Sequence, residues 1–144
     1  AFDQLGLESN NTPLLIYAPK LLPPREFEEA VGLADLLPTI AGLLGYEYEN
    51  LSMGRDLLMP APEGERAVPL VLREGTFPLI GAVTKDFLLQ MNYDGSDPSL
   101  HYLHSDTPLD NVEEQYPDEY QRLLPLARGL YETSHYMLYE NVRD

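Results

Sequence analysis

The sequence predicts an α/β chain whose second half forms a small antiparallel sheet packed by a long terminal helix. Two observations favour this fold. Four short runs rich in β-forming residues lie at 67–73, 79–83, 86–92 and 100–104, separated by turn residues. Residues 117–140 instead repeat apolar side chains at helical spacing. Because parallel strands need long crossovers, the closely spaced strands are expected to pair antiparallel.

The first 60 residues are expected to add one strand and one helix. Residues 13–19 form a continuous apolar run between two prolines, which favours a strand buried on both faces. Leucine and isoleucine follow helical spacing from residue 36 to 45. Asp35 is placed to cap this helix, Gly45 to end it, and Pro38 lies where the first turn tolerates proline.

The terminal helix carries Tyr120, Leu123, Leu124, Ala127, Leu130, Tyr131 and Leu138 near one face. Pro125 lies inside it, where a proline can bend a helix. Between residues 106 and 119 there are six acidic residues and no basic one, which predicts a solvated loop. A boundary is expected near the Pro- and Gly-rich connector, dividing the chain into residues 1–60 and 61–144.

Charge and composition exclude several functions. The chain has 9 Lys and Arg against 24 Asp and Glu, a formal net charge of −15, so nucleic acid is not an expected partner. The absence of cysteine excludes disulfides, Cys-ligated zinc and a thiol nucleophile. No apolar run approaches the roughly 18 residues that a membrane span requires, so a soluble chain is expected.

One segment is similar to a known family. Residues 31–45, VGLADLLPTIAGLLG, followed by Gly54-Arg55-Asp56-Leu57-Leu58, resemble a framework motif of sulfatases. The run at 12–19 resembles the strand that precedes this motif in the family, and the pattern of residues 73–117 resembles a diverged C-terminal subdomain. The chain thus looks like the C-terminal portion of a sulfatase-like protein of the alkaline phosphatase superfamily. Residues 127–133 are similar to the lipoteichoic acid synthase-like phosphoglycerol transferases.

The resemblance implies a function for a longer parent protein. Family members attack phosphate or sulfate esters with a Thr, Ser or formylglycine nucleophile held on a divalent metal, here Mn, Mg, Ca or Zn. The family's nucleophile and its Asp-His metal ligands lie upstream of residue 13. We therefore expect this chain to hold no catalytic, cofactor-binding or metal-binding residue, and to complete the substrate cleft of the parent. The implied parent is membrane-anchored and faces the extracytoplasmic side.

Several side chains could nevertheless carry chemistry. Asp35 could be a metal ligand, but its position favours capping. Thr39 could be a nucleophile, but it has no nearby base and is expected to bond back to its own turn. The adjacent Arg55 and Asp56 could grip an anion, although a turn closed by local hydrogen bonds is favoured.

The histidines and tyrosines leave similar alternatives. His101 and His104, with Asp106, could bind zinc, yet strand geometry points the two histidines to opposite faces and favours a surface strand end. His135 is expected at an exposed helix end. The tyrosines could stack on carbohydrate or bind a partner, although core packing with hydroxyls at the rim is favoured; they are Tyr116, Tyr120, Tyr131, Tyr136 and Tyr139.

Two partner hypotheses follow. In the first, the chain binds the remainder of its own catalytic domain. Without that domain, the strand at 13–19 would pair with another copy to form a homodimer, or would stay poorly ordered. In the alternative, the chain is a non-catalytic binding module that recognises a cell-envelope polymer or a protein through its sheet and tyrosine-bearing helix.

Overall fold

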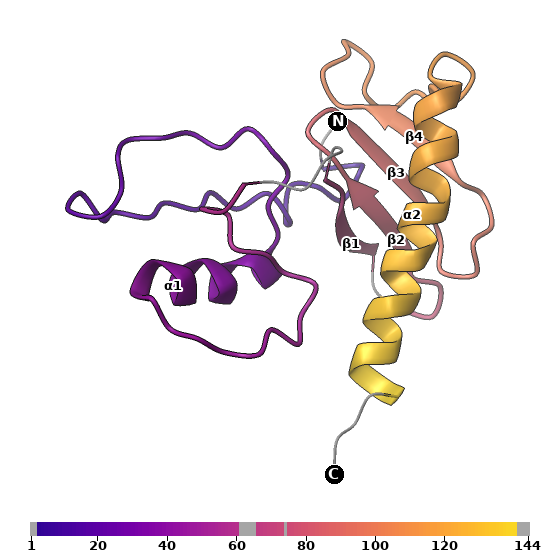
Figure 1. The fold of residues 1–144 in the computed structure, drawn as a ribbon. Helices are drawn as coiled ribbons and strands as arrows, with labels where there is room; N and C mark the ends of the chain where they lie inside the picture. Colours follow the sequence, from indigo (N-terminus) through magenta and orange to yellow (C-terminus); the bar gives the residue numbers. More distant parts are fainter. Residues whose placement is uncertain (1–2, 61–65, 74, 141–144) are drawn as a thin grey trace.

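The computed structural model describes residues 3–60, 66–73 and 75–140. A four-stranded sheet and a long helix form one side of the molecule, and the lobe of residues 3–60 lies beside them (Figure 1). The elements in chain order are η1 (Leu33–Asp35), α1 (Leu36–Leu44), β1 (Val68–Arg73), β2 (Leu79–Val83), β3 (Phe87–Asn92), β4 (Ser99–Tyr102), α2 (Pro117–His135) and the π-helix η2 (Tyr136–Glu140).

The sheet is an antiparallel meander with the order β1-β2-β3-β4. It confirms the predicted strands, although β4 ends at Tyr102, two residues earlier than expected. The register pairs Ile80 with Met91 and Leu89 with Leu100. Because side chains alternate along a strand, this register sends one apolar set to each face of the sheet.

Helix α2 covers one face of the sheet, as predicted (Figure 1). Leu123 and Ala127 of α2 are fully or almost fully buried there. The rest of this core comes from the strands and the segments that flank them, namely Ala67, Ile80, Ala82, Phe87, Leu89, Met91, Leu100 and Val112. The mixed α/β fold with a closing helix is therefore confirmed.

The N-terminal segment covers the opposite face. Leu5 and Leu7 are buried against Leu88 of β3, whose side chain points away from α2. Between them, Gly6 adopts a φ of +69°, and a Cβ there would lie 2.7 Å from the carbonyl oxygen of Leu72. Only glycine fits so close to the edge strand, and the sheet is consequently buried on both faces.

The end of α2 differs from the prediction. The α-helix stops at His135 and continues as a π-helical turn, so the side chains beyond it leave the core-facing stripe. Leu138 is 72% exposed, and Tyr136 and Tyr139 are also exposed, which makes their predicted core packing wrong. Pro117 begins the helix at the favoured first position, and Pro125 lies inside it.

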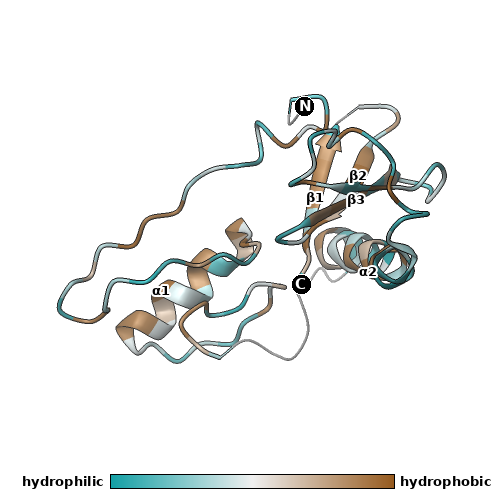
Figure 2. Cartoon of the chain, turned by 90° about the horizontal axis from the view of Figure 1, so that it is seen from above, coloured by the Kyte–Doolittle hydropathy of each residue, from teal (hydrophilic) through white to brown (hydrophobic). Residues whose placement is uncertain are grey.

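Helix α1 is confirmed within one residue, and Gly45 ends it with a φ of +68°. Its buried face consists of Pro38, Thr39 and Ala41. The brown colouring of much of α1 in Figure 2 marks the hydrophobic residues of this helix. An apolar stripe on its other side stays exposed. We call this the α1 stripe; it consists of Leu33, Leu37, Ile40 and Leu44.

The prediction of a strand at residues 13–19 is wrong. These residues form no ladder in the described structure, and Leu15 and Tyr17 are 89% and 86% exposed. A buried strand needs a neighbour on each side, and all four strands of the described sheet come from residues 68–102. The division at residue 60 borders on 61–65, outside the described residues, and stays a prediction. None of the described helices is both long and apolar enough to cross a membrane.

The burial of the sheet under α2 can be tested with a pair of leucines. Leu89 is fully buried, and Leu89→Ala is expected to lower the free energy of unfolding by about 2–5 kcal/mol, because it opens a cavity under α2. Leu15→Ala is the matched control and should change stability by about 0.5 kcal/mol or less, since Leu15 is exposed. Urea unfolding measures both. A large loss for Leu15→Ala would show that residues 13–19 are buried in solution.

Candidate functional site

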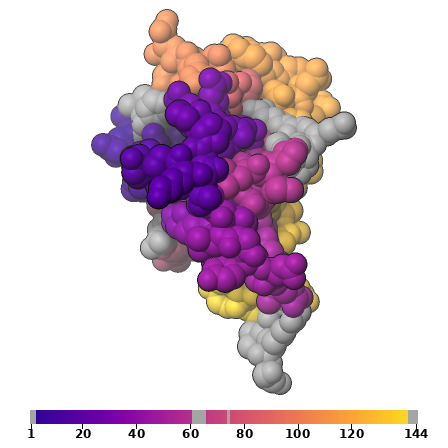
Figure 3. All heavy atoms as spheres, turned by 60° about the vertical axis from the view of Figure 1, so that its left-hand side comes forward, coloured from indigo at the N-terminus to yellow at the C-terminus, as the bar shows by residue number. Residues whose placement is uncertain are grey.

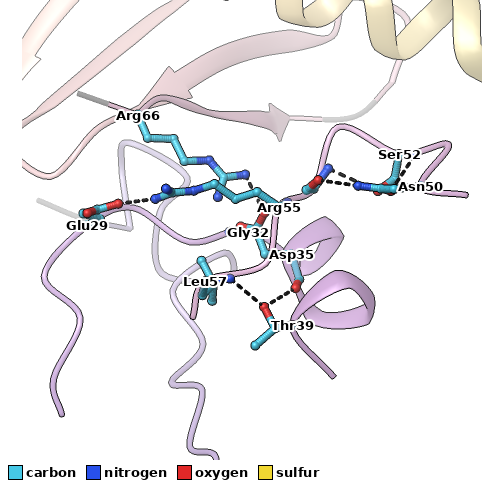
Figure 4. Close-up of polar contacts among 10 residues, drawn as sticks. Glu29, Gly32, Asp35, Thr39, Asn50, Ser52, Arg55, Leu57 and Arg66 are labelled. Carbon is cyan, nitrogen blue, oxygen red and sulfur yellow. Dashed lines mark hydrogen bonds and ion pairs between the residues drawn. The ribbon is translucent and has the colours of Figure 1, made fainter. Parts of the chain in front are cut away.

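The strongest polar cluster lies where α1 meets the connector of residues 50–58, and its centre is the carboxylate of Asp35 (Figure 4). Asp35 is completely buried. Its Oδ1 accepts a 2.8 Å hydrogen bond from the backbone N–H of Arg55 and a 2.6 Å charged bond from Nη2 of Arg66. Its Oδ2 accepts the backbone N–H of Gly32 at 2.8 Å. One carboxylate therefore joins three segments of the chain.

Thr39 makes a second connection between α1 and the connector, one helical turn after Asp35. Its hydroxyl donates to the carbonyl oxygen of Asp35 at 2.7 Å and accepts the backbone N–H of Leu57 at 3.1 Å. Arg55 and Leu57 are two residues apart, so their N–H groups point the same way from an extended segment, and Asp35 and Thr39 are four apart on the helix. The spacing of the two N–H groups matches the spacing of the two helix side chains. The connector is therefore bound to α1 through its backbone N–H groups.

Two glycines allow this close approach. A Cβ on Gly54 would lie 1.8 Å from the carbonyl oxygen of Ala34, and a Cβ on Gly42 would lie 2.0 Å from Oδ2 of Asp56. Real Cβ contacts are never so short, so a side chain at Gly54 would push the connector off the backbone of the helix, and one at Gly42 would displace the Asp56 carboxylate. The carbonyl of Gly54 accepts a bond from the Asn50 side chain, which fixes the turn. The spaced motif of residues 35–45 and 54–58 is thus one packed unit.

The cluster is electrostatically balanced. Burial alone would raise the pKa of Asp35, but the Arg66 guanidinium and the backbone N–H groups of Arg55 and Gly32 outweigh it and hold the pKa below its usual value. Asp35 is therefore ionised in the folded protein at neutral pH. The side chain of Arg55 pairs with Glu29, 26 residues earlier in the chain. Each guanidinium of the cluster consequently has a carboxylate partner.

The predictions for this cluster are partly right. Asp35 is a structural residue, but its side chain caps no N–H of α1; it accepts those of Gly32 and Arg55 instead. The back-bond of Thr39 is confirmed. Asp56 closes a local turn by accepting the N–H of Leu58 at 2.9 Å, as predicted. The prediction is wrong for Arg55, whose side chain reaches a distant glutamate.

The hydrogen bonds of this arrangement position backbone segments of the chain. Thr39 is completely buried, and both its donor and an acceptor site are used. A nucleophile needs access to substrate and a base to take its proton. The cleft of about 240 Å³ beside the cluster is bordered by Arg25, Phe27, Glu29 and Arg55. Glu29 lines the cleft and pairs with Arg55, while Arg25 lies over the ring of Phe27, so two arginines face one glutamate there.

The histidines do not gather into a metal site. His101 is buried rather than at a surface strand end, because its ring bonds inward to Gln90 and Ser99 of the sheet. Burial lowers the pKa of His101 despite the opposing effect of the nearby backbone of residues 108–110. His104 lies beyond β4, 3.1 Å from Asp86. Within the described ranges, no three His, Asp or Glu side chains are placed to hold a metal ion.

The tyrosines divide into two groups. Tyr116 stacks edge-on against Phe87 with ring centroids 5.1 Å apart, while Tyr120 and Tyr131 pack on the core, as predicted. His135 and Tyr139, by contrast, stack at 4.8 Å on the exposed end of α2. Sequence reasoning missed Arg66 and Glu29, because their partners lie 31 and 26 residues away and no local pattern marks them.

Removing the charge of Asp35 should destabilise the fold in a pH-dependent way. Asp35→Ala is expected to lower the free energy of unfolding by about 3–5 kcal/mol at pH 7, because Arg66 loses its buried partner. The folded-state pKa lies below the unfolded value, so the contribution of Asp35 is complete above about pH 4 and is lost as pH falls through the folded-state pKa.

Unfolding by urea between pH 2 and 7 measures this effect. The Asp35→Asn variant should be less stable at pH 7. It should also flatten the acid limb of the plot of unfolding free energy against pH. The control is Asp106→Asn, which changes an exposed carboxylate and should leave the limb unchanged. An acid limb that Asp35→Asn does not alter would contradict the role given to this carboxylate.

The packed glycine can be tested against a glycine in open space. Gly54→Ala should detach the connector from α1 and cost more than about 2 kcal/mol, because its Cβ would overlap the backbone of Ala34. Gly129 lies inside α2, and a methyl group added there would meet nothing within 4 Å, so Gly129→Ala should stabilise by about 0.5–1 kcal/mol. Thermal unfolding followed by circular dichroism compares the two. Equal effects would contradict the close contact.

Comparison with known proteins supports the fold expectation. No protein-family model matches the sequence, and no curated protein matches it either. Among solved structures, the chain is similar to BT4656, determined in complex with its substrate D-glucosamine-2-N,6-O-disulfate. The match has 19% identity and a TM-score of 0.50, and covers 74% of this chain. It covers 24% of the other chain, so this protein has the fold of about a quarter of that longer structure.

Proposed function

We propose that this chain is the part of a metal-dependent sulfatase-like hydrolase or phosphoglycerol transferase that completes the substrate cleft without supplying catalytic groups. The observation that carries the proposal is the likeness to a quarter of BT4656, a protein whose substrate is a sulfated sugar. The nucleophile and the Mn, Mg, Ca or Zn ion would belong to residues of the parent outside this chain. So would the anchor that holds the parent on the extracytoplasmic side of the membrane.

The exposure of the α1 stripe supports the proposal that another part of the parent protein covers it. Leu33 is 89% exposed, Leu37 65% and Leu44 58%, although the helix is apolar on nearly every side. A helix that is hydrophobic all round is normally buried in a larger protein. The extended segment that holds Leu14, Leu15 and Tyr17 is also exposed and apolar. We propose that the remainder of the catalytic unit covers both surfaces.

The position of these surfaces fits that role. Residues 3–60 come forward as a lobe when the molecule is turned by 60° (Figure 3). Inside this lobe, the Asp35 cluster binds the connector to α1 and ties both to Arg66, directly before the sheet. The α1 stripe is therefore attached to a fixed framework, and the sheet with α2 would be held at a set position beside the cleft. Separated from the parent, the same surfaces would favour a homodimer.

The expected outcome is that catalysis requires residues upstream in the same reading frame. The purified chain should not hydrolyse 4-nitrophenyl sulfate or 4-nitrophenyl phosphate with Mn, Mg, Ca or Zn, whereas the chain joined to its upstream residues should do so with a metal. In the joined protein, Leu37→Glu should reduce kcat/KM by about tenfold or more, because it places a charge in the interface. Leu109→Glu, at an exposed loop leucine, is the matched control.

Sedimentation of the isolated chain completes the test. Self-association that Leu37→Glu removes and Leu109→Glu keeps would show that the α1 stripe is an interface. Metal-dependent turnover by the isolated chain, or an upstream frame without a hydroxyl nucleophile and an Asp-His pair, would overturn the proposal. The second outcome would favour the alternative of a stand-alone binding module.

A further inference from the structure

A cleft of about 440 Å³ lies at the C-terminal end of α2 and is unrelated to the Asp35 cluster. It lies between this helix end and the turn that follows β3. Its lining is aromatic and acidic, with three tyrosines, one histidine and two glutamates, namely Tyr93, Tyr131, Glu132, His135, Tyr136 and Glu140. Neither Lys nor Arg is among these lining residues.

The helical wall of the cleft is made by residue spacing. Tyr131 and His135 are four residues apart, as are Glu132 and Tyr136, so each pair lies on one side of the helix. The π-helical turn from Tyr136 to Glu140 then keeps Glu140 on this side. Such turns are rare and occur often at functional sites. Here the turn explains why the end of α2 departs from the core-facing pattern.

The opposite wall is held in place before any ligand arrives. The N–H of Tyr93 donates to the carbonyl oxygen of Pro78 at 3.1 Å, which fixes the start of the turn. The guanidinium of Arg128 donates to the carbonyl oxygen of Gly95 at 3.0 Å and so joins this turn to α2. On the helical wall, the rings of His135 and Tyr139 are in tilted contact, with their centroids 4.8 Å apart. Both walls are therefore ordered, which lowers the entropic cost of binding.

The chemistry of the lining selects a cation. The faces of tyrosine rings carry negative electrostatic potential and attract ammonium groups, most strongly when the cation is alkylated and weakly hydrated. Within the described residues, the side chains of Glu132 and Glu140 form no hydrogen bond or ion pair, so both carboxylates are available to a cation in the cleft. The net charge of −15 adds a long-range attraction for cations and repels phosphate and sulfate groups.

From this geometry we propose that the cleft binds an alkylammonium group, such as the trimethylammonium group of choline. The tyrosine rings contact the methyl groups, and the glutamates neutralise the charge. This site lies outside the sulfatase-like chemistry proposed above and does not depend on it. A ligand of this kind would attach the chain to a choline-bearing molecule or surface through α2, while the α1 stripe stays free for a different contact.

The experiment titrates the intact chain with choline and follows heat release and tyrosine ring NMR signals. A neutral isostere, 3,3-dimethyl-1-butanol, has the same shape without the charge and should bind at least tenfold more weakly. Tyr136→Ala should weaken choline binding about two- to thirty-fold through the lost cation–π contact. Glu132→Gln should weaken it and reduce its dependence on salt.

Two controls distinguish binding in this cleft from non-specific binding of choline. Tyr48→Ala removes a tyrosine that is 42% exposed but lies outside the cleft, and it should leave choline binding unchanged. Phosphatidylcholine vesicles, compared with free choline, show whether a lipid headgroup can reach the cleft. No choline binding, equal binding of the neutral isostere, or binding that Tyr136→Ala does not alter would overturn the proposal. None of these outcomes changes the expected behaviour of the joined catalytic protein.

Discussion

The arrangement of the N-terminal lobe depends on one buried negative charge. Asp35 receives hydrogen bonds from the segments that precede α1, follow it and lead into the sheet. Taking a carboxylate out of water is costly, and these three donors offset that cost only when all of them are in place. The carboxylate thus specifies one arrangement of the connector, whereas apolar contacts alone would allow several. Thr39, Gly42 and Gly54 give the same arrangement its close fit.

The parts that sequence reasoning predicted well are those specified by neighbouring residues. The four strands and both helices follow from alternation, helical spacing and the placement of Pro117 and Gly45. The segment at 13–19 shows the limit, because an apolar run predicts burial but not the neighbour that would bury it. The Asp35–Arg66 pair and the cleft at Tyr93 bring together residues more than 30 positions apart. No periodicity in the sequence predicts such long-range contacts.

The two surfaces of the molecule suggest different kinds of contact. The α1 stripe is apolar and broad, as a surface is when another part of a protein covers it. The cleft at the end of α2 is smaller and combines aromatic rings with charge, which suits a small group of defined chemistry. One chain can serve both, because the two surfaces belong to different elements, α1 and the C-terminal end of α2.

The packing of Leu5 and Leu7 on β3 has a consequence for synthesis on the ribosome. These leucines leave the ribosome before the sheet does, and Leu88, against which they pack, follows more than 80 residues later. Until β1, β2 and β3 have paired, the N-terminal segment has no surface to cover and exposes its apolar side chains. The sheet can form from local hairpins alone, since its strands are consecutive. The segment that seals the sheet is therefore synthesised before the sheet but docks only after the sheet has formed.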